Sequence, residues 1–116
     1  MVNVYVEIYG VQSNQDDGAI MKGLLLENGF NLSNLNERDV VIVNTCVVKD
    51  KTANKIRERI KNIYKNKKVI IAGCMAEAES NICVKLFPNA SLVNTFHVSS
   101  IVEAVNKSLN NEAVRF

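Results

Sequence analysis

Three cysteines are the residues of this chain with the most possible chemical roles. Cys46, Cys74 and Cys83 form no Cys-x-x-Cys pair and are odd in number, which argues against a disulfide framework and leaves metal binding, redox chemistry or simple burial open. Cys46 and Cys74 each follow a run of apolar, mostly β-branched residues that predicts a strand. A thiolate between a strand and a helix is stabilised by amide N–H groups and the helix dipole. Cys46 and Cys74 are therefore the candidates for thiolate chemistry, and Cys83, inside a predicted helix, is expected to be a small buried residue.

The elements that must position these cysteines alternate between the periods of strands and helices. The pattern predicts strands at residues 2–9, 40–43, 69–72 and 91–93, and helices at about 16–28, 51–65, 77–86 and 101–109. Asp16 or Asp17 is the expected N-cap of the first helix, and Gly29 is expected to end it. Strict alternation predicts one α/β domain over residues 1–116, with an open, mostly parallel four-stranded sheet, doubly wound and flavodoxin- or Rossmann-like.

Ligands of such sheets bind at the carboxyl ends of the strands, close to the switch in strand order. Three segments follow predicted strand ends and carry polar or sulfur side chains: residues 10–14, 44–46 and 73–75. Cys46 and Cys74 thus occupy equivalent positions in two of the three loops. The residues expected to shape these loops are Gly10, Asn14, Asn44, Thr45 and Gly73.

Several other known types of site at strand ends are excluded because the sequence lacks their motifs. A Cys-x5-Arg phosphatase loop fails because Thr52 and Ser80 stand at the arginine positions, and neither a Walker A nor a GxGxxG motif follows the first strand. A phospho-acceptor receiver domain would need an aspartate where Cys74 stands. His97 has no evident partner and no nucleophile elbow accompanies it, so we expect it to be structural or exposed.

Positive charge is concentrated in one window of the chain. Residues 49–68 hold nine basic and two acidic side chains, a net charge of +7 in a protein of net charge +2. The helix expected there places its apolar residues on one stripe, formed by Ala53, Ile56, Ile60, Ile63 and Tyr64. Lys55, Arg59 and Lys61 lie off that stripe and are candidate contacts to a polyanion, with a merely solvated helix face as the other interpretation.

The composition is that of an ordinary globular protein. The 116 residues are 47% hydrophobic and 22% charged, with one proline, which is not typical of disordered or collagen-like chains. The longest strictly apolar run is far shorter than the roughly 20 residues of a membrane span. The N-terminal residues show no basic region ahead of an apolar one, so we predict a cytoplasmic protein without a signal peptide or membrane partner.

Taken together, the strand-end loops resemble those of the N-terminal domain of radical S-adenosylmethionine methylthiotransferases. That domain typically has YGCQ-N followed by an aspartate, then VVNTC, then a strand that ends in AGC. This chain has YGVQSN at residues 9–14, Asp17, VIVNTC at 41–46 and IAGCM at 71–75. NTCVVK at 44–49 and FPNA at 87–90 look most like the archaeal and eukaryotic branch, which acts on threonylcarbamoyladenosine in tRNA.

The resemblance implies a function as one part of an iron–sulfur enzyme. In the family, three loop cysteines hold an auxiliary [4Fe–4S] cluster that serves in sulfur insertion. A following domain carries a second [4Fe–4S] cluster and S-adenosylmethionine, and a small C-terminal domain binds RNA. The products are methylthio-adenosines at position 37 of tRNA or, in one branch, a methylthiolated ribosomal protein. The chain is therefore expected to be a fragment of a tRNA-processing transferase, inactive by itself. In such an enzyme the polyanion would be tRNA, and Lys55, Arg59 and Lys61 are the expected contacts to RNA phosphates.

One ligand position departs from the family pattern. Val11 stands where the first cysteine is expected, so that only Cys46 and Cys74 match metal-ligand positions. Gly18 and Ala19 also replace the usual small polar and acidic pair after Asp17. The cluster site is thus expected to be impaired or empty. The alternatives are a metal-free flavodoxin-like binding or scaffold domain and, less well supported without a CxxC motif, a free-standing thiol redox protein.

Overall fold

The described part of the chain forms one twisted parallel sheet. The computed structural model describes residues 3–9, 12–34, 39–45, 50–64, 68–73, 80–93, 100–110 and 112–114. Within these residues the five strands are β1 (Asn3–Ile8), β2 (Asn31–Leu32), β3 (Val40–Thr45), β4 (Lys68–Gly73) and β5 (Ser91–Val93). All neighbouring strands are parallel, and their order is β2-β1-β3-β4-β5. This is the flavodoxin-like order, whose switch point lies between β1 and β3.

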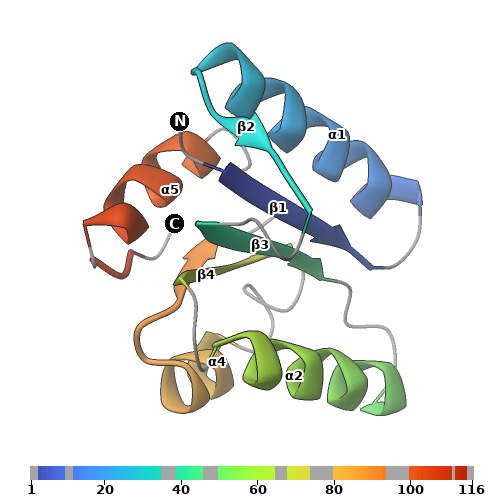
Figure 1. Cartoon of the computed structure of the whole chain (residues 1–116). Coiled ribbons are helices and arrows are strands. Elements are labelled where there is room, and N and C mark those ends of the chain that lie inside the picture. Colours follow the sequence, from blue (N-terminus) through green and yellow to red (C-terminus); the bar gives the residue numbers. More distant parts are fainter. Residues whose placement is uncertain are drawn as a thin grey trace.

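Helices cover both faces of the sheet, as the alternating pattern predicts (Figure 1). They are α1 (Gln12–Glu27), α2 (Asp50–Tyr64), α4 (Ser80–Leu86) and α5 (Ile101–Leu109). One core layer joins α1 and α5 to the sheet through Val40 and Ile42, and the other joins α2 and α4 through Val41 and Val43. The doubly wound α/β prediction is confirmed. None of the described helices combines the length and the apolar character needed to cross a bilayer.

The core follows directly from the apolar pattern. Every residue of β3 is buried, as expected of a β-branched strand with a helix layer on each side. On α2, Ile56, Ile60 and Ile63 are each less than 5% exposed and pack in the same layer. Cys83 is fully buried in that layer, which agrees with its prediction as a small core residue.

The prediction of four strands was one short. The fifth, β2, has only two residues and pairs with β1, with Asn3 opposite Asn31 and Val4 opposite Leu32. A two-residue strand has no alternation that a sequence window could detect. Its pairing is supported instead by long-range hydrogen bonds, from the Asn31 side-chain amide to the Asn3 side-chain carbonyl (2.9 Å) and from Ser33 N–H to the Val4 carbonyl (2.9 Å).

The predicted start of the first helix was also wrong. Helix α1 begins at Gln12, so Asp16 and Asp17 lie inside the helix instead of capping it, and Asn14 belongs to its first turn instead of a loop. The early turns carry no apolar stripe, which is why the pattern located only the later part. The predicted end is confirmed. Gly29 has φ +84°, and Phe30 N–H reaches the Leu25 carbonyl at 3.0 Å, as in a Schellman motif.

The two central strands extend further than their apolar runs. Strand β3 continues through Asn44 and Thr45, and β4 runs from Lys68 to Gly73, so these polar and glycine residues end the strands instead of following them. The helix expected from residue 77 is described from Ser80 onward, and its earlier residues lie outside the described part. The remaining elements agree with the prediction to within one or two residues.

Candidate functional site

The carboxyl ends of β1, β3 and β4 meet at the same edge of the sheet. Ile8 pairs with Asn44, and Thr45 pairs with Gly73. Tyr9 N–H adds one more bond beyond the end of β1, to the Asn44 carbonyl at 2.9 Å. The three strands therefore end side by side at this edge, and β1 and β3 flank the switch point where ligands bind in such folds.

The candidate ligand residues follow these ends closely in the sequence. Cys46 comes directly after Thr45, Cys74 directly after Gly73, and Val11 two residues after Tyr9. All three lie outside the described residues, as does Gly10, so their convergence stays a prediction. Among the residues that the structure does describe, no group of three or more His, Cys, Asp or Glu side chains could hold a metal ion.

Gly73 allows the ends of β3 and β4 to pack closely against each other. Its φ is +88°, and a Cβ atom there would lie 2.5 Å from the backbone oxygen of Thr45 and 2.8 Å from the side-chain oxygen of Asn44. The Thr45 hydroxyl donates a hydrogen bond to the Ala72 carbonyl at 2.6 Å. Asn44 and Thr45 are at most 1% exposed. The expected loop-shaping residues Asn44, Thr45 and Gly73 thus form a closely packed framework at the two strand ends that directly precede Cys46 and Cys74 in the sequence.

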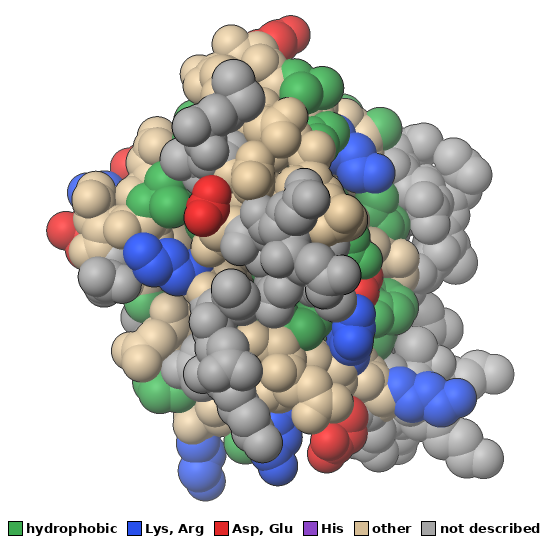
Figure 2. Space-filling view, viewed as in Figure 1, with side chains coloured by type: hydrophobic (Ala, Val, Ile, Leu, Met, Phe, Trp, Pro, Cys, Tyr) green, Lys and Arg blue, Asp and Glu red, His purple; other side chains and the backbone are tan. Residues whose placement is uncertain are grey.

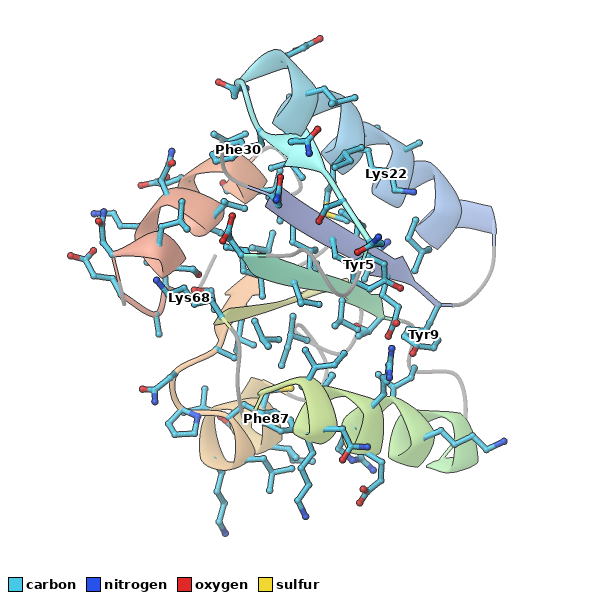
Figure 3. All side chains as sticks on the ribbon, in the orientation of Figure 1. Tyr5, Tyr9, Lys22, Phe30, Lys68 and Phe87 are labelled. Carbon is cyan, nitrogen blue, oxygen red and sulfur yellow. The ribbon has the colours of Figure 1, made fainter. Side chains whose placement is uncertain are left out.

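A polar cluster that the sequence analysis missed lies beside this edge. We call Tyr5, Glu7, Tyr9 and Arg59 the Glu7 cluster. The Glu7 carboxylate accepts hydrogen bonds from the Tyr5 hydroxyl (3.1 Å) and the Tyr9 hydroxyl (2.6 Å). It also forms an ion pair with Arg59 of α2 (3.0 Å). Figure 3 shows Tyr5 and Tyr9 on the α2 side of β1. The alternation of Tyr5, Glu7 and Tyr9, with an acidic residue in a strand covered by helices, was the signal that could have revealed it.

The cluster shifts the pKa of each of its members. Burial by itself raises the pKa of Glu7, but the hydrogen bonds and charge of Arg59, with the two tyrosine hydroxyls, outweigh it and lower that pKa. Burial and the Glu7 carboxylate raise the pKa of Tyr5, and they raise the pKa of Tyr9 to about 12. Both tyrosines are therefore protonated donors at neutral pH, and the cluster ties α2 to the end of β1.

Comparison with known proteins assigns the chain to a family. Residues 3–95 match the family model described as uncharacterized protein family UPF0004. The chain belongs to this family. A probable threonylcarbamoyladenosine tRNA methylthiotransferase of Methanothermobacter thermautotrophicus is 36% identical over 112 residues, which cover 94% of the chain and 26% of the relative. A tRNA-2-methylthio-N(6)-dimethylallyladenosine synthase of Thermosipho melanesiensis is 34% identical over 116 residues, covering 97% and 26%.

These relatives also show how much of a longer protein the UPF0004 domain corresponds to. A probable threonylcarbamoyladenosine tRNA methylthiotransferase of Methanocaldococcus jannaschii is 45% identical over 83 residues, 69% of the chain and 19% of the relative. The chain spans about a quarter of the length of the curated relatives it matches, apart from this shorter match. The resemblance to the N-terminal domain of methylthiotransferases is confirmed.

The predicted RNA-contacting residues of the UPF0004 domain differ in their surroundings. Lys55 and Lys61 are exposed on α2. Arg59, on the same helix, points to Glu7, and its side chain is 39% exposed. Lys61 also lines a pocket of about 300 Å³ between α2 and the end of α4. Two of the three candidates thus face solvent, whereas the third is bonded within the Glu7 cluster.

The charge of Glu7 should contribute measurably to folding stability. Because the folded-state pKa of Glu7 lies below its ordinary value of 4.5, its contribution is complete above that pH and is lost as the pH falls through the lower folded value. We expect Glu7→Gln to lower the free energy of unfolding by about 1–2 kcal/mol at pH 7. The loss should shrink steadily in urea titrations taken from pH 5 to pH 3.

A second acidic residue supplies the matched control. Glu112 pairs with Lys107 at 3.3 Å, but both side chains are exposed, at 58% and 44%. Glu112→Gln should therefore change the unfolding free energy by less than about 0.5 kcal/mol at either pH. A loss in Glu7→Gln that is equal at pH 7 and pH 3 would show that its cause is packing and not charge.

Proposed function

We propose that this UPF0004 domain is the auxiliary, cluster-bearing N-terminal domain of a cytoplasmic tRNA methylthiotransferase. The complete enzyme adds a methylthio group to a modified adenosine at position 37, in the branch that acts on threonylcarbamoyladenosine. One observation carries the proposal. Thr45 and Gly73 are paired across adjacent parallel strands, and each directly precedes a cysteine. Two thiolates leaving neighbouring strand ends are suited to bind one metal cluster.

The residues present fit a [4Fe–4S] cluster only in part. Cys46 and Cys74 supply two thiolates, the usual ligands of such clusters, whereas Val11 has no donor atom at the third position. The glycine and the buried polar residues at the ends of β3 and β4 give these loops a rigid base. We therefore propose that Cys46 and Cys74 hold a cluster that is incomplete or labile in the chain as it stands.

The remaining parts of the reaction belong to other domains in this proposal. A radical S-adenosylmethionine domain with its own [4Fe–4S] cluster would supply the methyl group and the radical chemistry, and a C-terminal domain would bind RNA. The isolated chain is accordingly proposed to have no turnover. Its own share in RNA binding would come from phosphate contacts by Lys55 and Lys61, while Arg59 is bonded to Glu7.

Iron binding tests the proposal directly. After anaerobic reconstitution and gel filtration, the chain should retain fewer than four irons, and Cys46→Ser or Cys74→Ser should remove most of what remains. Cys83→Ala is the matched control. This variant should leave the iron content unchanged, because Cys83 is fully buried in the core. Equal iron retention in all three variants would favour a metal-free flavodoxin-like scaffold instead.

A further inference from the structure

A pocket opens on the side of the domain formed by α2 and α4. It has a volume of about 300 Å³ and is lined by Arg57, Glu58, Lys61, Leu86 and Phe87. Phe87 is only 3% exposed and so can form only the inner wall, whereas Leu86 is 52% exposed at the surface. The pocket therefore combines two apolar side chains with three charged ones. Its size is at the lower limit of small-molecule sites, enough for one nucleobase with its sugar.

The charge around this pocket is predominantly positive. Arg57 and Lys61 of α2 line the pocket, and the exposed Lys85 of α4 directly precedes its lining residue Leu86. Glu58 is the acidic residue among those that line it. Figure 2 shows several blue side chains and a red one along the lower part of the molecule, where Figure 1 places α2 and α4. This is the charge pattern that attracts a polyanion.

We infer that the pocket between α2 and α4 takes an unpaired nucleobase of RNA, while the surrounding lysines bind the adjoining phosphates. Proteins that bind single-stranded nucleic acid combine a basic surface with aromatic or apolar side chains against which a base packs. The inference deepens the proposed tRNA function and rests on it. An acidic amphipathic peptide would instead need a row of apolar anchor sites, whereas the exposed apolar residues of α4 are Ile82 and Leu86 alone.

Two variants separate the base contact from the phosphate contacts. The probe is an unmodified tRNA transcript, whose dissociation constant for the full chain is measured by fluorescence anisotropy from 50 to 200 mM salt. Lys61→Glu should weaken binding and reduce the slope of log Kd against log salt by about 0.7–0.9, the loss of one phosphate contact. Leu86→Asn should weaken binding about five- to tenfold without changing that slope. Leu86 is half exposed, so the variant should fold normally.

Lys22→Glu is the control for a general change of charge. Lys22 lies on α1, which covers the opposite face of the sheet (Figure 3), so its reversal should leave the salt slope unchanged. Equal effects of Lys22→Glu and Lys61→Glu, or unchanged affinity in Leu86→Asn, would overturn the pocket inference. Preferential binding of an acidic peptide to the pocket would also overturn it. The iron measurement is independent of all these results, so the proposed function stands or fails separately.

Discussion

Replacing Gly73 by alanine should destabilise the domain by about 2–5 kcal/mol. Two effects add up at this position. A residue with a side chain is disfavoured at φ +88° by about 1–2 kcal/mol, and the new Cβ would lie 2.5 Å from the Thr45 backbone oxygen. Backbone atoms between two paired strands cannot move aside as a flexible side chain can, and such overpacking typically adds about 1–3 kcal/mol. Urea unfolding followed by circular dichroism measures the change.

The same replacement at Gly23 provides a control with the opposite sign. Gly23 lies within α1, and a Cβ there would meet no atom within 4 Å. Alanine is favoured over glycine inside a helix, so Gly23→Ala should stabilise the domain by about 0.5–1 kcal/mol. Comparable losses in the two variants would mean that the conformation of Gly73 is not what holds the strand ends together.

The sequence predicted best the elements whose burial is periodic. The β-branched run of β3 and the isoleucine stripe of α2 depend on local spacing alone, and both were located to within two residues. The register that aligns Thr45 with Gly73 could not be read from either strand by itself. It follows only from the strand order, although the rule that ligands bind at the carboxyl ends of parallel strands already predicted that these strand ends share one edge of the sheet.

The parts that were missed depend on contacts between distant residues. The ion pair of Glu7 with Arg59 joins residues that lie 52 positions apart, and no local pattern marks either as a partner of the other. The charge pattern accordingly groups Arg59 with the exposed lysines of its helix. The two-residue strand β2 is likewise defined by its pairing with β1 and not by its own sequence. The alternation of Tyr5, Glu7 and Tyr9 marks a polar face on β1, but only the topology shows that Arg59 is its partner and that β2 pairs with β1.

Restoring a thiolate at position 11 should change the metal content more than any other single substitution. Val11→Cys should raise the iron retained after anaerobic reconstitution from a sub-stoichiometric amount to about four per chain, with broad iron–sulfur absorption in the visible range. The reason lies in the number of ligands. Two thiolates leave at least two irons of a cubane open to exchange, whereas three leave a single open iron. The present chain should accordingly purify colourless.

Second-site variants show whether the gain comes from the proposed set of ligands. Iron acquired by Val11→Cys should be lost again when Cys46→Ser or Cys74→Ser is added, because each removes one of three thiolates. Cys83→Ala in the same background should keep its iron, since Cys83 is buried in the core on the α2 and α4 side of the sheet. Four tightly bound irons in the unaltered chain would require a further ligand, and the assignment of three positions would then be wrong. A gain that survives the loss of Cys46 and Cys74 would place the cluster elsewhere and end the proposal.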